Sequence, residues 1–256
     1  MLIILPPSET KSFGGENSPL DFAALSFPAL NNIRREIATD LQSLNVDEAL
    51  SVLGISEKLR PAAEANTHLG ITPTMPAILR YTGVLYDALD APSLPTEALR
   101  RLAIGSALFG VLGALDPIPF YRLSGSNKLP FRAASAHAGQ PAPTMKARWG
   151  KALSHELQQL HDSGELLIDL RSGTYQQLGK VTGAITVRVQ SVQADGSRKV
   201  VSHFNKHYKG EFARILATAD GIPENIVEVI DIARSAGLTV EEPKENGNEI
   251  TLVVEP

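Results

Sequence analysis

The sequence predicts an α+β fold, with short helices packed on a mixed or antiparallel sheet in a single domain over residues 1–256. Two observations support this class. Helical segments and short apolar runs typical of strands follow one another without a regular βαβ rhythm. The 256-residue chain is 43% hydrophobic, enough for a substantial core, and it shows neither an internal repeat nor an evident interdomain linker.

The first half is expected to be one buried strand followed mainly by helices. The apolar run at 2–5 predicts the strand, which Pro6-Pro7 ends and from which a polar loop follows, Ser8-Glu9-Thr10-Lys11. Helical spacing predicts helices over 28–44, 46–53, 56–67 and 96–112. Ser56 suits the N-cap of the third helix, and the breaker Asp116–Pro119 follows the fourth.

The second half is expected to alternate strands with longer helices. After a long irregular connection, a helix opens at Thr144 and runs through His161, carrying Trp149. Strands are expected over 166–170, 185–192 and 198–204, with helices over 207–219 and 223–236. Asp195-Gly196 and Asn246-Gly247 each predict a hairpin.

Basic residues are concentrated in two segments, although the formal net charge is −4. The first contains Arg122, Lys128, Arg132, Lys146, Arg148 and Lys151 and no acidic residue. The second contains Arg198, Lys199, Lys206, Lys209 and Arg214, opposed only by Glu211. The net charge argues against a uniformly basic nucleic-acid surface. Each segment is either a solvated face or part of an anion-binding cleft.

Several functional classes are excluded or disfavoured by composition. There is no cysteine, hence no disulfide and no thiolate nucleophile. No glycine-rich nucleotide motif is present, and we expect no cofactor. His203, His207 and Glu211 are spaced like metal ligands on a helix, but His203 is expected to end a strand, so we expect no metal. No signal peptide and no apolar run of roughly 18 residues is found, so we expect a cytoplasmic protein without a membrane partner.

Segment 46–65 is similar to a helix-hairpin-helix nucleic-acid module. Its Gly-Ile-Ser turn separates two helical stretches, and Lys58 and Arg60 follow directly. In such modules, backbone N–H groups at the turn bind a phosphate. The alternative is an ordinary pair of short helices packed into the core.

Residues 106–123 are expected to form a buried helix followed by a turn out of the core. Gly110 and Gly113 would allow close helix packing, and the Asp116-Pro117 break would then turn Tyr121 and Arg122 outward. Arginine binds phosphate or carboxylate bidentately, and a tyrosine hydroxyl adds a directed hydrogen bond. Tyr86 is either a packing aromatic or a ligand-binding group.

The chain resembles the YaaA family of bacterial peroxide-stress proteins along essentially its whole length. The motifs that carry the resemblance are the first strand with its Pro-Ser loop, ISEKL, YTGVLY, SALFGVLGALDPIPFYRL, Arg148-Trp149-Gly150, DLRSGTY and HYKGEFARIL. The resemblance implies one YaaA-like α+β domain in the cytoplasm that limits oxidative damage. It also implies DNA binding through a helix-hairpin-helix and a positive cleft.

This chain departs from the family pattern at three positions. Lys11 comes two places later than the lysine of the family's Ser-Pro-Ala-Lys-Thr loop. Lys209-Gly210 stands where many members have Arg-Gly, which keeps the charge and loses the bidentate fork. Gly113 replaces an arginine of many members.

Two functions remain open on this sequence, with a scaffold lacking chemistry as a third. The first is weak, salt-dependent binding of DNA in the peroxide response. The second is an enzyme acting on a small anionic or nucleoside-like substrate. The candidate binding residues are Ser8, Thr10, Lys11, Ser56, Lys58, Arg60, Tyr86, Tyr121, Arg122, Ser172, Tyr175 and Lys209. No catalytic residue is assigned. Lys11, Lys58, Arg122 and Lys209 are expected to converge on one anion site, the alternative being four separate surface ion pairs.

Overall fold

A mixed sheet forms the centre of the structure. The structure is a computed structural model, and it describes residues 1–192, 197–200, 204–245 and 247–254. The strand order is β10-β11-β8-β7-β1-β4-β5, and β9 pairs with β8. The strands are β1 (Leu2–Leu5), β4 (Leu102–Ser106), β5 (Gly110–Gly113), β7 (Leu167–Asp169), β8 (Ile185–Val192), β9 (Arg198–Val200), β10 (Thr239–Glu241) and β11 (Glu249–Val254). Neighbours from β4 through β11 pair in parallel, whereas β5, β9 and β10 pair antiparallel. The predicted α+β class and mixed sheet are confirmed.

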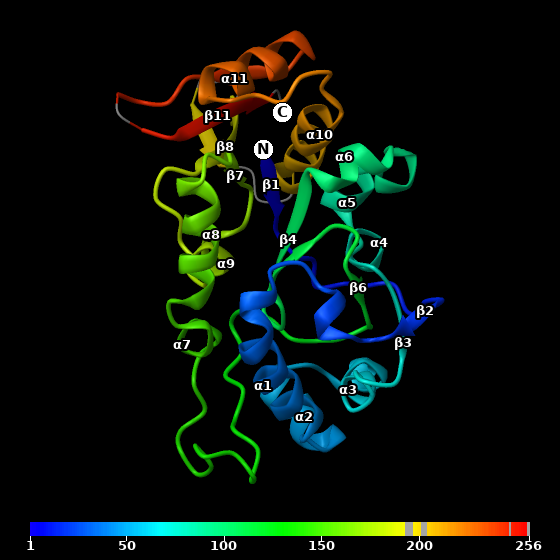
Figure 1. Cartoon of the computed structure of the whole chain (residues 1–256). Helices are drawn as coiled ribbons and strands as arrows, with labels where there is room; N and C mark the ends of the chain where they lie inside the picture. The colour runs from blue at the N-terminus through cyan, green and yellow to red at the C-terminus, as the bar shows by residue number, and fades with distance from the viewer. Residues whose placement is uncertain (193–196, 201–203, 246, 255–256) are drawn as a thin grey trace.

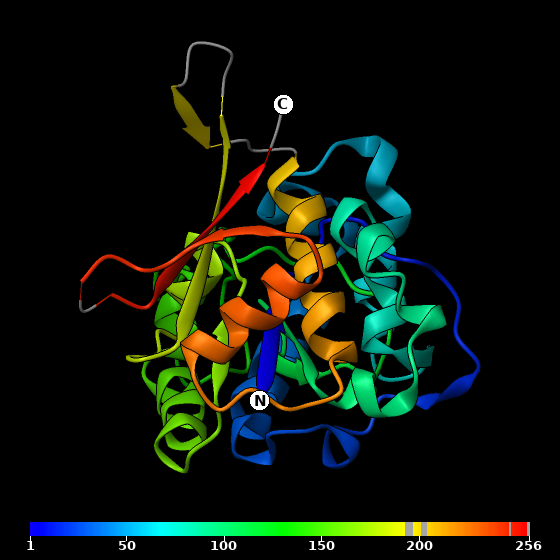
Figure 2. The same cartoon turned by 90° about the horizontal axis from the view of Figure 1, so that it is seen from above.

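Helices cover the sheet and extend beyond one of its ends. They are α1 (Asn31–Gln42), α2 (Val46–Leu53), α3 (Arg60–Asn66), α4 (Ala77–Arg80), α5 (Val84–Leu89), α6 (Thr96–Arg100), α7 (Met145–Trp149), α8 (Ala152–Asp162), α9 (Gly173–Gln176), α10 (Phe204–Thr218) and α11 (Ile226–Ser235). Both cartoon views place α8 and α10 on opposite sides of the sheet (Figures 1 and 2). None of the described helices has the length and hydropathy that a membrane crossing requires.

A smaller substructure lies beyond the carboxyl end of β1. It contains α1–α3 and a three-stranded sheet with the order β2-β3-β6, formed by Asn17–Pro19, Pro73–Pro76 and Pro117–Ile118. In Figure 1, β1 starts near the upper part of the molecule and runs down towards this substructure. The loop that follows β1 is therefore placed between the two parts.

The predicted helix over 96–112 is wrong beyond its first turns. Helix α6 ends at Arg100, and β4 and β5 then form an antiparallel hairpin. At Gly110 the backbone has φ 75°, and a Cβ there would lie 2.9 Å from the Trp149 indole. Gly110 and Gly113, the first and last residues of β5, therefore belong to a tight hairpin and not to a packed helix. A continuous apolar run has no period that separates strand from helix.

Other predicted elements are confirmed, some of them with changed limits. Strands β1 and β8 have the predicted residues. The helix opening after Thr144 is interrupted at Gly150, whose φ is 53°, and resumes as α8. Strand β9 ends at Val200 and α10 already begins at Phe204, so the predicted strand over 198–204 is too long. Asp195-Gly196, His203 and Asn246 lie outside the described residues.

Buried arginines bind backbone carbonyls inside the core. Arg34 is fully buried and donates to the carbonyl oxygens of Phe109 and Val111, which hold the β4–β5 hairpin against α1. Burial lowers the pKa of Arg34 to about 10, opposed by Asp116. Arg80, also fully buried, donates to the carbonyls of Ser12 and Ile118. Both arginines therefore cross-link segments far apart in the chain.

Candidate functional site

Three polar segments meet where the parallel strands end. The loop Pro6–Lys11 follows β1, Ser106 ends β4, and Leu170–Ser172 follows β7. Because β4, β1 and β7 are parallel neighbours, their carboxyl ends share one edge of the sheet. Ligand sites of α/β sheets are commonly found at this edge.

The loop after β1 is held by its own hydroxyl groups and by the segment before α5. Ser8 Oγ donates to the Thr10 carbonyl at 2.5 Å and accepts from the Thr82 amide at 3.2 Å. Tyr86 is buried, and its hydroxyl donates to the Pro6 carbonyl at 2.9 Å. Ser8 and Tyr86 therefore shape the loop, and the Tyr86 hydroxyl is already committed to the backbone.

Lys11 ends this loop against two tyrosine rings. Its Nζ donates to the Ser8 carbonyl at 3.1 Å and lies 4.9 Å from the centre of the Tyr81 ring and 4.5 Å from that of Tyr121. Burial lowers the pKa of Lys11 to about 7; Glu9 opposes the shift, and Arg122 adds to it. Near neutral pH, Lys11 therefore exchanges between ammonium and free amine.

A chain of buried hydroxyl groups lies behind Lys11. The Tyr81 and Tyr121 hydroxyls are 2.6 Å apart, and that of Tyr121 is 2.7 Å from Ser106 Oγ. Ser106 Oγ also accepts from the Phe109 amide at 3.0 Å. Burial raises the pKa of both tyrosines well above its ordinary value, so they stay protonated. The prediction that Tyr121 leaves the core is wrong, because its side chain is buried at the carboxyl edge of β4.

Arg122, by contrast, reaches partly into solvent, as predicted. One guanidinium nitrogen donates to the Glu9 carbonyl at 2.7 Å and the other contacts Glu9 Oε2 at 2.8 Å. The Asn66 amide group forms two 2.8 Å hydrogen bonds with the Arg122 backbone. The position of Arg122 is therefore fixed by the β1 loop and by α3.

A small cavity, which we call the loop pocket, opens beside these groups. Its volume is about 220 Å³. It is lined by Glu9, Thr10, Lys11, Phe13, Lys58, Leu59, Pro61, Ala62, Phe120 and Arg122. The rings of Phe13 and Phe120 stack with centres 3.9 Å apart. The loop pocket thus combines three basic side chains and one acidic side chain with an apolar, partly aromatic wall.

A second cavity, the strand-end pocket, lies on the β7–β8 side of the same edge and has a volume of about 480 Å³. Lys209, Lys206, Ser172 and Arg171 are among its lining residues. Lys209 Nζ donates to the Leu170 carbonyl at 3.1 Å, and burial lowers its pKa. The four cations predicted to converge are therefore divided: Lys11, Lys58 and Arg122 line the loop pocket, and Lys209 lines the strand-end pocket.

The remaining predicted residues lie near the pockets or are already engaged. Tyr175 lines neither the loop pocket nor the strand-end pocket. Its hydroxyl accepts a hydrogen bond from the Gly125 amide at 3.0 Å. Ser56 stands at the N-cap of the short 3₁₀ helix Glu57–Leu59 without a capping hydrogen bond from its side chain. Arg60 pairs with Glu57 and, at 2.7 Å, with Asp47. Arg60 is thus neutralised locally by two acids of its own neighbourhood.

The helix-hairpin-helix prediction is not confirmed. Helix α2 has a capping box and ends at Gly54, which is left-handed with φ 64°, and the 3₁₀ turn then leads into α3. Lys58 is exposed on that turn and forms no ion pair with a described acidic residue. The segment is thus a helix pair in which Lys58 is the available cation.

Most arginines of the two basic segments are ion-paired within the fold. The pairs are Arg132 with Glu36 and Asp40, Arg148 with Asp40, Arg198 with Glu241, and Arg214 with Asp90. In the described part of the chain, the exposed lysines of these segments, Lys128, Lys146, Lys151 and Lys206, have no ion pair. The predicted positive clusters are therefore weaker as anion-binding surfaces than the sequence indicates.

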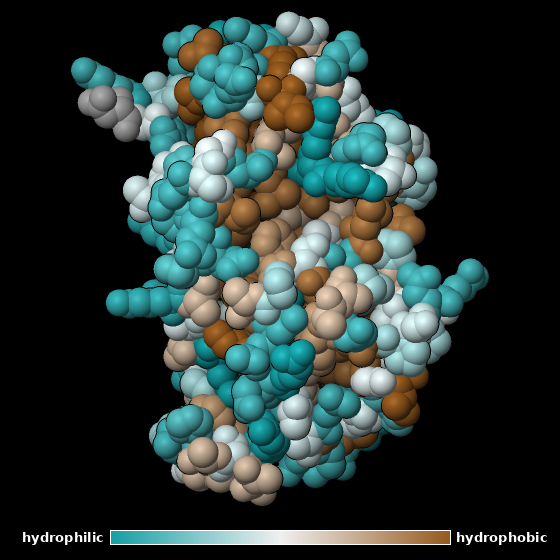
Figure 3. All heavy atoms as spheres, in the orientation of Figure 1, coloured by the Kyte–Doolittle hydropathy of each residue, from teal (hydrophilic) through white to brown (hydrophobic). Residues whose placement is uncertain are grey.

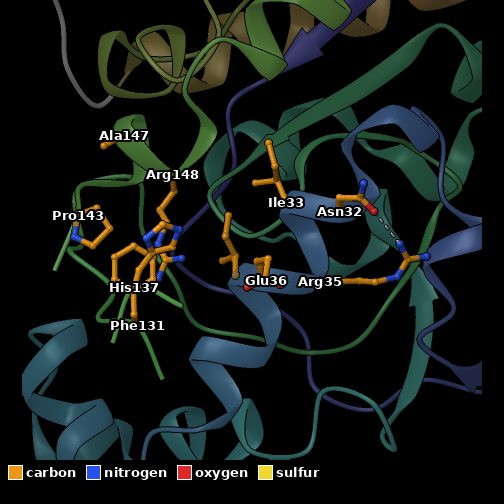
Figure 4. Close-up of a pocket in the computed structure, with 10 residues that line it drawn as sticks. Asn32, Ile33, Arg35, Glu36, Phe131, His137, Pro143, Ala147 and Arg148 are labelled. Atoms are coloured by element: carbon orange, nitrogen blue, oxygen red, sulfur yellow. Dashed lines mark hydrogen bonds between the residues drawn. The ribbon is translucent and has the colours of Figure 1, made fainter. Parts of the chain in front are cut away.

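A third cavity, of about 500 Å³, lies between α1 and the connection that leads to α7. Figure 4 shows Arg148, Phe131 and His137 gathered at one side, and Asn32 beside Arg35 at the other. The Arg148 guanidinium lies 4.0 Å from the centre of the Phe131 ring. In the same orientation as Figure 1, the surface shows a band of hydrophobic residues across the middle, between more hydrophilic regions (Figure 3). The cavity between α1 and the connection to α7 could not be predicted from the sequence, because its lining is assembled from segments about 100 residues apart.

Comparison with known proteins gives one consistent result. The family model described as peroxide stress protein YaaA matches residues 1–242. A UPF0246 protein of Corynebacterium glutamicum is 62% identical over 254 residues, covering 99% of this chain and all of that protein. One of Streptomyces coelicolor is 38% identical over 94% of this chain and 92% of its own. One of Shewanella woodyi is 26% identical over 84% of this chain and 86% of its own.

Proposed function

Because the chain belongs to the family of the peroxide stress protein YaaA, we propose that it serves the peroxide response by binding and converting a small anionic molecule in the loop pocket. The supporting observation is that Lys11, Lys58 and Arg122, from three separate segments, line one concave site. The chain contains no cysteine and three methionines, so direct oxidation of its own side chains offers little chemistry. Protection then comes from what the protein binds or converts.

The charges of the pocket favour an anion over a neutral ligand. Three basic groups face one acid, Glu9, and that acid is engaged by Arg122. Bringing several cations together costs free energy unless an opposite charge offsets it. Asn66 fixes the Arg122 backbone through two hydrogen bonds, and a carboxylate or phosphate would compete with Glu9 for the Arg122 guanidinium.

The size of the pocket favours a small ligand over a duplex. Its volume of about 220 Å³ is below the roughly 300–1,000 Å³ of drug-sized ligand sites. The stacked pair Phe13 and Phe120 offers an apolar wall beside the charges. The ligand class that fits is a compact molecule with an anionic group and a small apolar or planar part.

Sulfate binding is expected to depend on Arg122 and to respond to Glu9 in the opposite direction. Arg122→Ala should weaken the affinity about tenfold, since charge-assisted hydrogen bonds are lost. Glu9→Gln should strengthen it, because the competing carboxylate is removed. Binding should also weaken as pH rises through about 7, because Lys11 loses its charge there, whereas sulfate does not titrate. Isothermal titration calorimetry measures all three.

Lys180→Ala is the matched control, since Lys180 is exposed and lines neither pocket. It should leave the affinity unchanged. Equal affinities for the wild type, Arg122→Ala and Glu9→Gln would refute anion binding in the loop pocket.

DNA binding is the second candidate, supported by exposed lysines that form no ion pair with any residue the structure describes. Lys58 stands on the turn between α2 and α3. Lys128 precedes α7, Lys146 lies in α7, and Lys151 is the N-cap residue of α8. Lysines of this kind contact phosphates without reading sequence. The proposed binding is weak, since the net charge is −4 and most arginines are paired.

The affinity for a labelled duplex is expected to fall by roughly tenfold or more between low and physiological salt, because phosphate contacts release counterions. Fluorescence anisotropy across a salt series measures this. Lys128→Ala should weaken DNA binding and leave sulfate binding unchanged, which separates the two candidates. Affinity that stays constant across the series would contradict the phosphate-contact model.

A further inference from the structure

We propose that Lys11 forms an imine with the carbonyl carbon of an anionic aldehyde or ketone bound in the loop pocket. The inference rests on the proposed function, because Arg122 and Lys58 would hold the anionic group of the same molecule. It adds a reaction type, a nucleophile and a substrate class to a site so far described only by its charges.

The first support is the position of the Lys11 amino group. Lys11 is one of the residues that line the pocket, and its Nζ donates to the Ser8 carbonyl, a neutral acceptor, at 3.1 Å. Lys11 forms no ion pair with a carboxylate in the described part of the chain, because the carboxylate of neighbouring Glu9 contacts Arg122 instead. A lysine without a carboxylate partner can release its proton and become a nucleophile.

The second support is the electrostatic environment. Burial, together with the nearby cations Arg122 and Arg80, lowers the pKa of Lys11 from 10.5 to about 7. Its neutral fraction at pH 7 then exceeds that of an unperturbed lysine by about three orders of magnitude. Desolvation and a neighbouring cation are the two usual ways of activating a lysine for imine formation.

The third support is the aromatic surface beneath the amine. Tyr81 and Tyr121 present their rings to Lys11 Nζ at 4.9 and 4.5 Å. Ring faces attract cations, so they would stabilise the positively charged iminium product after the amine has reacted. Both hydroxyls stay protonated because burial raises their pKa values, and neither competes as a nucleophile.

The reaction requires no further reagent. The Lys11 ammonium releases one proton to water, and its nitrogen lone pair attacks the carbonyl carbon to give a carbinolamine after proton transfer to the oxygen. The carbinolamine hydroxyl takes up one proton and leaves as water, and the nitrogen–carbon double bond forms. The net change is lysine ammonium plus carbonyl to protonated imine plus water, with the proton released in the first step balanced by the one taken up in the last.

Reductive trapping tests this assignment on the intact wild-type chain. The probe is glyoxylate, an aldehyde with a carboxylate, in the presence of sodium cyanoborohydride. Reduction of the imine leaves one carboxymethyl group on the lysine, which peptide mass spectrometry locates. Lys11 should be labelled at least about tenfold faster than exposed Lys180 at pH 7, and the rate should rise between pH 6 and 8 as the amine loses its proton.

Three comparisons keep the outcome decisive. Sulfate should slow labelling of Lys11 and not of Lys180, since it occupies the same anion site. Acetaldehyde, which has no carboxylate, should label Lys11 with much less preference over Lys180. Arg122→Ala should reduce glyoxylate labelling of Lys11 while leaving that of Lys180 unchanged.

Failure of the imine and failure of the anion site give different results. If sulfate binds with the expected dependence on Arg122 but Lys11 is labelled no faster than Lys180, the imine assignment is overturned and the anion site stands. If sulfate binding is also independent of Arg122, the proposed function fails as well. Because labelling is mapped on the wild type, the test does not depend on a Lys11 variant that folds.

Discussion

Replacing Asp169 with Asn is expected to cost about 3–5 kcal/mol of the free energy of unfolding, the usual result of breaking a buried ion pair by removing one partner. Asp169 ends β7, and its two carboxylate oxygens accept from the Arg171 Nε at 2.8 Å and from a terminal nitrogen at 2.9 Å. Arg171 is 1% exposed and Asp169 is 4% exposed. The substitution would leave a guanidinium charge inside the protein without its counter-charge.

Urea unfolding followed by circular dichroism measures the loss. The matched control is Glu249→Gln, which breaks the Arg188–Glu249 pair, whose side chains are 48% and 47% exposed. That change should cost no more than about 1 kcal/mol, because exposed pairs contribute little. Equal losses for the two variants would show that burial of the Asp169–Arg171 pair does not determine its contribution.

Gly210→Ala is expected to destabilise the protein by about 2–3 kcal/mol through overpacking. Gly210 lies in α10 where that helix crosses α5, and a Cβ at this position would overlap the Leu85 carbonyl oxygen and crowd Ala88. Helix propensity alone predicts that Gly210→Ala stabilises the protein, since Ala is favoured over Gly by about 1 kcal/mol inside a helix. Whether the free energy of unfolding falls or rises in Gly210→Ala therefore decides whether close contact between α10 and α5 requires this glycine.

The control for this change is Gly221→Ala, since a Cβ at Gly221 meets no atom within 4 Å. It should change the free energy of unfolding by less than about 0.5 kcal/mol. A stabilised Gly210→Ala variant would contradict the packing described for these two helices. Thermal unfolding of both variants supplies the comparison.

Helices and strands were predicted best where an apolar segment is flanked by polar residues or by proline or glycine. The strand at 2–5 ends at Pro6-Pro7, and the strand at 185–192 alternates buried and more exposed residues, which is the period of a half-buried strand. Residues 102–112 are buried nearly throughout, so their hydrophobicity has no period, and the hairpin was mistaken for a helix. Tertiary packing, with Trp149 over Gly110, decides this region.

The candidate site was predictable in its residue types and only partly in its assembly. The loop after β1 and Arg122 could be identified because strand ends and chain breaks gather polar groups. The division of the four cations between the two pockets could not be predicted, because it depends on where α10 places Lys209. Nor could the ion pairs: Arg122 meets Glu9 across 113 residues, and Arg132 meets Asp40 across 92. Acidic partners so distant in the chain leave no local pattern.

The central claim is that the loop pocket is an anion site. The most direct test is the structure of a crystal of this protein soaked in sulfate. We expect a sulfate ion bound to the Arg122 guanidinium, with Lys58 or Lys11 as a second partner, because these groups line the pocket together. The Arg122→Ala protein in the same crystal form should lack that ion. A loop pocket that stays free of sulfate, while sulfate occupies the strand-end pocket beside Lys206 and Lys209, would contradict the claim.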